Sequence, residues 1–149
     1  MTQEEKELLM KDLCARLPYG VKLKKNYGDN AIVELCGVDV DRNTVNICDY
    51  RGKSITSCEI DNPLFIAMVK SRYLPYLFPM SSMTEEQKQE YTYIVNYISP
   101  DDTDNWKEGE FIYVEQLTQL MHFYHINHLD YMGLIPMGLA NDATGLNIY

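Results

Sequence analysis

Four short stretches between Val21 and Ile60 alternate apolar and polar residues, and this period of two constrains the fold more than any other feature. Alternation is typical of strands with one buried and one solvated face. The stretches are separated by YGDN, DRN and RGK, whose Gly, Asp and Asn residues favour tight turns. Short separators indicate hairpins, so we predict an antiparallel meander that could curl into a small barrel. Its strands are VKLKKNY, AIVELCGVDV, TVNICDY and SITSCEI, and Gly37 predicts a bulge in the second.

Helices are predicted on both sides of this meander. Thr2 and Glu5 form a capping-box pattern at the start of a first helix that Pro18 ends. Thr84 and Gln87 repeat the pattern at the start of a second helix, which ends at Ser99-Pro100, and a third is expected over about residues 112–125. The apolar stripes of the three are Leu9, Leu13 and Leu17 (with Cys14 beside them); Tyr91, Ile94, Val95 and Ile98; and Val114, Leu117, Leu120, Met121 and Tyr124.

Two segments fit neither pattern. Residues 63–80 carry Pro75 and Pro79, which exclude one regular helix, so we expect a short helix or a strand along the edge of the sheet. The last twenty residues hold too much Gly and Pro for a helix, yet enough apolar residues to pack as an ordered, irregular segment. The prediction is therefore a single α+β domain over residues 1–149, containing the N-terminal helix, the small sheet or barrel, the two further helices and the C-terminal segment.

Composition excludes several classes of protein. The net charge is −9 and no basic stripe is present, which disfavours binding to duplex nucleic acid. No apolar run reaches the roughly 18 residues of a membrane span, and the acidic start is unlike a secretory signal, so a cytoplasmic protein is expected. The four cysteines form no C-x-x-C pair and are interpreted as buried free thiols, a single reactive cysteine being the alternative.

No motif indicates catalysis, and no catalytic residue or cofactor is predicted. The sequence lacks a G-x-S-x-G elbow and a phosphate-binding glycine run. His122, His125 and His128 are spaced three apart, which is conceivable for a metal, but the end of a helix also favours cationic side chains there. We predict no metal site and leave the role of these histidines open.

A tyrosine-rich stretch before the second helix is the candidate ligand site. The chain has 12 tyrosines, a residue suited to partner surfaces and to stacking on flat ligands. A helix start attracts phosphate or carboxylate groups, and a nearby arginine can pair with the same anion. A core-facing strand followed by a capped helix would explain the stretch equally well. The predicted ligand-binding residues are Arg72, Tyr73, Tyr76, Ser81, Ser82 and Thr84, with Asp130 and Tyr131 from the C-terminal segment.

Three blocks of the chain, KDLCARLPYGV, YLPYLFPMSSMTEEQ and HLDYMGLIPMGLA, carry a resemblance. They resemble a family of small uncharacterised proteins that bacteriophages and mobile elements of gut bacteria carry, with D-L-C-A-R-L-P-Y-G-V, Y-L-R-P-M-S-S-M-T and D-Y-R-G-L-I-P-M-G-L-A patterns. Where the family pattern has arginine, this chain has Phe78 and Met132. Any anion site that those arginines make in the family would here depend on Arg72.

The resemblance implies a phage accessory protein that acts by stoichiometric binding. We expect non-catalytic binding of a small, anionic, nucleotide-like ligand, for example as an anti-defence sponge that sequesters an immune signal. A sponge implies a homo-oligomer with a pocket between protomers. The alternatives are a protein that inhibits a host protein through an exposed aromatic patch, and a structural or housekeeping phage protein.

Overall fold

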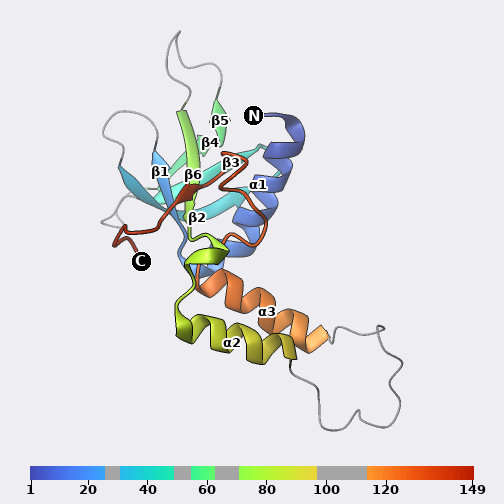
Figure 1. Cartoon of the computed structure of the whole chain (residues 1–149). Helices are drawn as coiled ribbons and strands as arrows, with labels where there is room; N and C mark the ends of the chain where they lie inside the picture. Colours follow the sequence, from blue (N-terminus) through green and yellow to red (C-terminus); the bar gives the residue numbers. More distant parts are fainter. Residues whose placement is uncertain (26–30, 49–54, 63–70, 97–113) are drawn as a thin grey trace.

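The computed structural model describes residues 1–25, 31–48, 55–62, 71–96 and 114–149, and it has the predicted α+β fold (Figure 1). A curled sheet forms the larger part, with an N-terminal helix lying along it. Two further helices lie side by side and extend away from one end of the sheet (Figure 1). The functional argument depends on the junction between these parts and on the outer side of the first helix.

The four predicted strands are confirmed as β1 (Lys22–Lys25), β2 (Ile32–Asp39), β3 (Thr44–Cys48) and β4 (Ile55–Glu59), each antiparallel to the next. The predicted bulge is confirmed as well, because the β2–β3 register shifts between Leu35 and Gly37. A Cβ atom on Gly37 would lie 2.9 Å from Nδ2 of Asn46, so any other residue there would force the Asn46 side chain to shift. The alternating burial of β2 and β3 points one face inward, as the period of two predicts.

The sheet closes on itself through a strand that the sequence placed at an edge. β6 (Ser71–Leu77) pairs with β1 on one side and with β5 (Asp61–Asn62) on the other. The strands β4 and β5 stand at opposite ends of the strand order β4-β3-β2-β1-β6-β5, and only Ile60 separates them in the chain. The two ends of the sheet are thus joined by consecutive residues, which closes the sheet into a small barrel. The prediction of an edge strand was therefore wrong. Proline is tolerated inside the sheet because Pro75 comes after the residues of β6 that pair with β5 and before the residues of β6 that pair with β7 (Asn141–Asp142).

The N-terminal helix α1 (Gln3–Arg16) packs its apolar stripe against β2. Both reciprocal hydrogen bonds of the predicted capping box form between Thr2 and Glu5. Leu9 and Leu13 are fully buried, and a 3-10 turn, η1 (Leu17–Tyr19), follows. The main core therefore lies between α1, the inner face of the barrel and the C-terminal segment; its most buried members are Leu9, Leu13, Val21, Leu23, Val45, Leu77 and Leu134.

The other two helices form an arm with a small core of its own. A 3-10 turn, η2 (Met80–Ser82), leads into α2 (Glu85–Asn96), which packs on α3 (Val114–Ile126). Both predicted helices are confirmed, but their buried faces differ from the prediction. Val95 and Leu117 are 43% and 48% exposed, whereas Phe123, absent from the predicted stripe, is buried. An arm packed on one side buries a narrower face than a helix inside a core. Ile98, the predicted end of the second helix at Ser99-Pro100 and the predicted start of the third at residue 112 lie outside the described residues.

The C-terminal segment is ordered and irregular, as predicted. β7 pairs parallel with β6, and Leu134, Leu139, Ala140 and Ala143 enter the main core. The cysteine prediction was wrong, since all four thiols are free but Cys14 and Cys36 are exposed and Cys48 and Cys58 only partly buried. Among the helices of the described residues, none has the length and apolar content needed to cross a membrane.

Candidate functional site

The three blocks that carry the resemblance meet at one place, the junction of barrel and arm. Arg16, from the first block, donates from Nη2 to the carbonyl of Leu129 in the third block at 2.8 Å. Phe78, from the second block, pairs with the same segment: its amide donates to the carbonyl of His128, and the amide of Asp130 donates to its carbonyl. The resemblance therefore rests on segments that build one structural junction.

A buried ion pair lies at the centre of this junction. Nε of Arg16 donates to Oδ2 of Asp12 at 2.8 Å, and neither side chain is exposed. Within the described residues, Nη1 of Arg16 and Oδ1 of Asp12 have no hydrogen-bond partner. Burial raises the pKa of Asp12 more than the neighbouring guanidinium lowers it. The arginine is thus committed to its partners inside the protein and is not available to a ligand from solvent. Sequence reasoning missed this pair, although the i, i+4 spacing beside an apolar stripe was a signal.

Asp130 and Tyr131, two of the predicted site residues, belong to the same junction. The carboxylate of Asp130 is buried and accepts from the amides of Leu134 and Ile135 at 2.7 and 2.9 Å, so it holds the following turn. The ring of Tyr131 stacks on Tyr124 with centroids 4.9 Å apart and lies 5.3 Å below the guanidinium carbon of Arg16. These contacts give both residues a structural role.

The three histidines have different hydrogen-bond or stacking partners, although the ring of Tyr19 lies against both His122 and His125. His122 is exposed and bonds from Nδ1 to the hydroxyl of Tyr19 at 3.0 Å. His125 bonds from Nε2 to the hydroxyl of Tyr131 at 3.2 Å, and His128 stacks on Tyr149 with centroids 3.7 Å apart. Burial lowers the pKa of both His125 and His128 to about 4, with the charge of Arg16 adding to the effect. No group of three metal-ligating side chains occurs in the described parts of the chain.

The two tyrosines of the predicted ligand site, Tyr73 and Tyr76, are not on the surface. Tyr73 and Tyr76 are only 8% and 7% exposed, in a strand flanked by β1 on one side and by β5 and β7 on the other, and Tyr73 belongs to the main core. The hydroxyl of Tyr73 shares a hydrogen bond with Cys58, and burial raises the pKa of both tyrosines. Both residues are buried, so the core-facing explanation of this stretch fits them better than a wall open to a ligand. The backbone of Arg72 stands opposite that of Asp61 where β5 pairs with β6.

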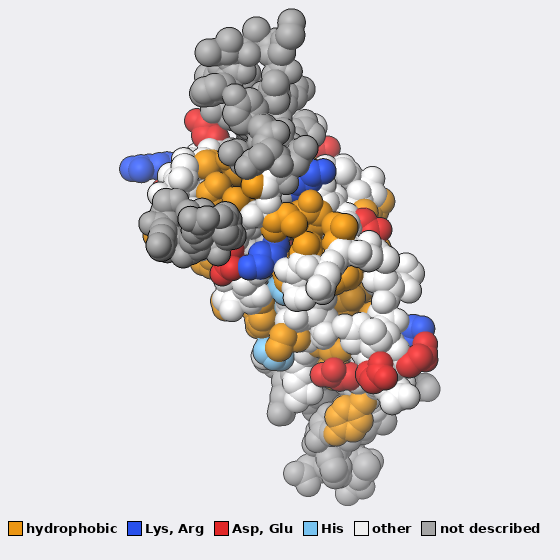
Figure 2. Space-filling view, turned by 90° about the vertical axis from the view of Figure 1, so that its left-hand side faces the viewer, with side chains coloured by type: hydrophobic (Ala, Val, Ile, Leu, Met, Phe, Trp, Pro, Cys, Tyr) orange, Lys and Arg blue, Asp and Glu red, His pale blue; other side chains and the backbone are white. Residues whose placement is uncertain are grey.

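The hydroxyls before α2 are also committed to local bonds. Ser82 donates to the carbonyl of Pro79 at 2.7 Å, and Thr84 caps the helix by accepting from the amide of Gln87 at 3.2 Å. Ser81 is exposed, but the first turn of α2 presents Glu85 and Glu86, and Figure 2 shows acidic side chains in a row over this helical end. An anion would meet repulsion there, so the predicted phosphate site at this helix start is not supported.

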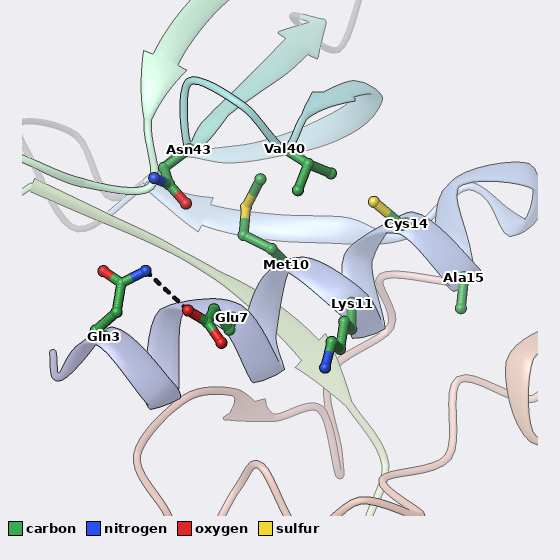
Figure 3. A pocket seen from close by; sticks show the side chains of 8 residues that line it. All are labelled: Gln3, Glu7, Met10, Lys11, Cys14, Ala15, Val40 and Asn43. Atoms are coloured by element: carbon green, nitrogen blue, oxygen red, sulfur yellow. Dashed lines mark hydrogen bonds between the residues drawn. The ribbon is translucent and has the colours of Figure 1, made fainter.

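A groove of about 730 Å³ lies elsewhere, between α1 and the turn that joins β2 to β3 (Figure 3). Met10 points from the helix between Val40 and Asn43 of the turn, and Cys14 points to the same side, whereas Lys11 and Ala15 point away from the turn (Figure 3). Polar side chains lie along the helix: Gln3 donates from Nε2 to Oε1 of Glu7 at 3.0 Å, and Lys11 follows one turn later. Sequence reasoning missed this site because its second wall comes from a turn distant in the chain.

The local chemistry of the groove follows from these residues. The amides of Gln3 and Asn43 can each donate and accept, Lys11 supplies a cation, and the exposed side chain of Val40 supplies an apolar surface, while Met10 is almost fully buried beneath it. Burial raises the pKa of the Cys14 thiol, so it lines the groove as an uncharged group.

Comparison of the chain with protein-family models, with curated proteins and with solved structures found no match.

Proposed function

We propose that the protein is a non-catalytic cytoplasmic binding protein, and that the groove beside α1 holds a small nucleotide-like ligand with a single phosphate. The observation that supports this proposal is the groove of about 730 Å³ with mixed apolar and polar lining. Its volume lies within the roughly 300–1,000 Å³ of small-molecule sites. None of the eight residues proposed from the sequence lines this groove, so the ligand class is retained while the site is reassigned.

The charge of the lining argues for a weakly charged ligand. Lys11 can pair with one phosphate, but Glu7 lies one turn away and the whole chain carries a net charge of −9. A triphosphate would therefore meet more repulsion than attraction. A nucleoside monophosphate or a cyclic nucleotide suits the site better, with its base on the exposed Val40 and its polar edge near the amides of Gln3 and Asn43. Sequestration of such a molecule would make the protein a sponge of the kind that the phage resemblance implies.

The test is native mass spectrometry and calorimetry of the purified protein with AMP, cyclic AMP and ATP. We expect AMP or cyclic AMP to add a discrete mass, and ATP to bind at least tenfold more weakly. Lys11→Ala should weaken phosphate-dependent binding, whereas the matched change Lys6→Ala, on the same helix but outside the groove lining, should not. Val40→Trp should block the groove, since Val40 is exposed and tolerates a larger side chain.

A clean spectrum with all three nucleotides would refute the nucleotide ligand. Binding that survives both Lys11→Ala and Val40→Trp would refute the groove as its site. The same spectra report the number of protomers and so test the expected homo-oligomer.

A second candidate function, binding to a host protein, is favoured by the apolar side chains that the arm exposes. Val95 on α2 and Leu117 on α3 are close to half exposed, and Gln116 next to Leu117 donates to the carbonyl of Val95 at 2.8 Å, which brings the two helices together there. Exposed apolar side chains on two helices that pack together suit a protein partner. If the protein inhibits a host protein through this surface, the double change Val95→Glu with Leu117→Glu should abolish that inhibition. Nucleotide binding should remain intact.

A further inference from the structure

Two cysteines on neighbouring strands share the outer face of the barrel. In β2 the buried side chains of Val33 and Leu35 point inward, which turns Glu34 and Cys36 outward. In β3 the inward residues are Val45 and Ile47, so Cys48 also points outward. Glu34 stands directly opposite Cys48 in the register, which makes Cys36 the diagonal neighbour of Cys48 on the same face.

The bulge places Cys36 between two register pairs of β2 and β3, on the same face as Cys48. The register passes from the pair Leu35–Ile47 to the pair Gly37–Asn46, so Cys36 is the extra residue of β2. Its thiol donates to the carbonyl of Asn46 at 3.3 Å, and Cys48 is near enough to contribute to the raised pKa of Cys36. Both thiols are free, Cys36 is exposed and Cys48 is partly exposed, so a small reagent can reach the pair.

We propose that Cys36 and Cys48 are a redox pair, a dithiol that low-molecular-weight disulfides such as oxidised glutathione convert reversibly into a cross-strand disulfide. The pair is a modification site separate from the groove and does not depend on the proposed ligand. Oxidation would join β2 covalently to β3 and close a hairpin loop in the barrel, which restricts the unfolded chain.

The order of attack follows from the environment of Cys36. Partial desolvation, the neighbouring Cys48 thiol and the charge of Glu34 raise the pKa of Cys36 to about 11, so this thiol keeps its proton at neutral pH. Cys48 therefore attacks first: its thiolate bonds to one sulfur of oxidised glutathione, and the other glutathione leaves as a thiolate that takes up a proton. Cys36 then gives its proton to solvent and attacks Sγ of Cys48, which expels the second glutathione. The protein loses two electrons and two protons, and one disulfide is reduced to two thiols.

The experiment treats the wild-type chain with oxidised glutathione at neutral pH, counts free thiols under denaturing conditions and maps cross-links by mass spectrometry of peptides. We expect a Cys36–Cys48 cross-link that dithiothreitol reverses. A chain with Cys14→Ser and Cys58→Ser, which retains only the pair, should lose both thiols without keeping glutathione. Cys36→Ser should trap one glutathione on Cys48, whereas Cys48→Ser should leave Cys36 largely unmodified over the same time.

Three outcomes would overturn the proposal. One is glutathione that persists on Cys48 in the wild-type chain with no cross-link to Cys36. Another is a cross-link from either cysteine to Cys14 or Cys58 in place of the pair. The third is the recovery of both thiols unmodified after prolonged treatment. Because the wild-type chain carries the decisive measurement, a variant that fails to fold does not weaken the test.

Discussion

Replacing Arg16 by methionine should destabilise the fold far more than its size suggests, because Arg16 holds the junction through three different contacts. It bonds to Asp12 and to the carbonyl of Leu129 at 2.8 Å each, and its guanidinium lies over Tyr131. Methionine fills much of the same volume but leaves the carboxylate and the carbonyl without a donor. Removing one partner of a buried ion pair costs about 3–5 kcal/mol, a large part of the ~5–15 kcal/mol that a domain has.

The cost should fall near the lower end of that range and depend on pH. Burial already raises the pKa of Asp12, and without the guanidinium it would rise further, so the orphaned carboxyl would take up a proton. A carboxyl whose pKa is raised in the folded state favours folding at low pH and loses that contribution as the pH rises. The destabilisation by Arg16→Met should therefore grow with increasing pH.

The assay is urea unfolding followed by far-UV circular dichroism, with two comparisons. Arg42→Met removes an arginine that is 82% exposed and 3.7 Å from Asp39, and it should cost less than about 0.5 kcal/mol. The double change Asp12→Leu with Arg16→Met removes both charges, so it should cost less than Arg16→Met alone. The reasoning is refuted if Arg16→Met costs no more than Arg42→Met, or if the double variant is less stable than the single one.

Three further predictions follow from individual contacts. Burial lowers the pKa of His125 and His128 to about 4 from 6.5, so their contribution to stability is complete above pH 6.5 and is lost as the pH falls toward 4. The difference in unfolding free energy between wild type and His128→Asn, measured by urea unfolding, should therefore narrow as the pH falls through that range. Thr84→Ala removes the cap of α2 and should cost about 1 kcal/mol in the same assay, while Thr84→Ser should cost little. Gly37→Ala places a methyl group 2.9 Å from Nδ2 of Asn46 and should lower the unfolding free energy by about 1–3 kcal/mol. A second change, Asn46→Gly, should relieve this loss. A Gly37→Ala protein with an unchanged melting temperature would contradict the close contact with Asn46.

The candidate site shows how sequence reasoning about a single stretch can fail. The stretch before α2 combines tyrosines, serines and a helix start, and each property suits a ligand site by itself. Tyr73 and Tyr76 are nevertheless buried, because β1 and β5 flank their strand and the barrel closes over them. Nothing within residues 71–77 encodes that closure, which depends on β4 and β5 being consecutive in the chain. The groove was missed for the same reason, since Met10 and Val40 are brought together only by the packing of α1 on β2.

The sequence by itself determined the features whose contacts are local. Both capping boxes, the strands β1 to β4 and the bulge at Gly37 were predictable, because a cap joins residues three apart and a hairpin joins strands across a short turn. Tertiary structure alone decided which face of α3 is buried, where β6 lies, and that Arg16 would meet the carbonyl of Leu129, a residue 113 positions away. The physical reason is that burial and ion pairing depend on which surfaces meet, and a local pattern specifies an amphipathic face without specifying what covers it.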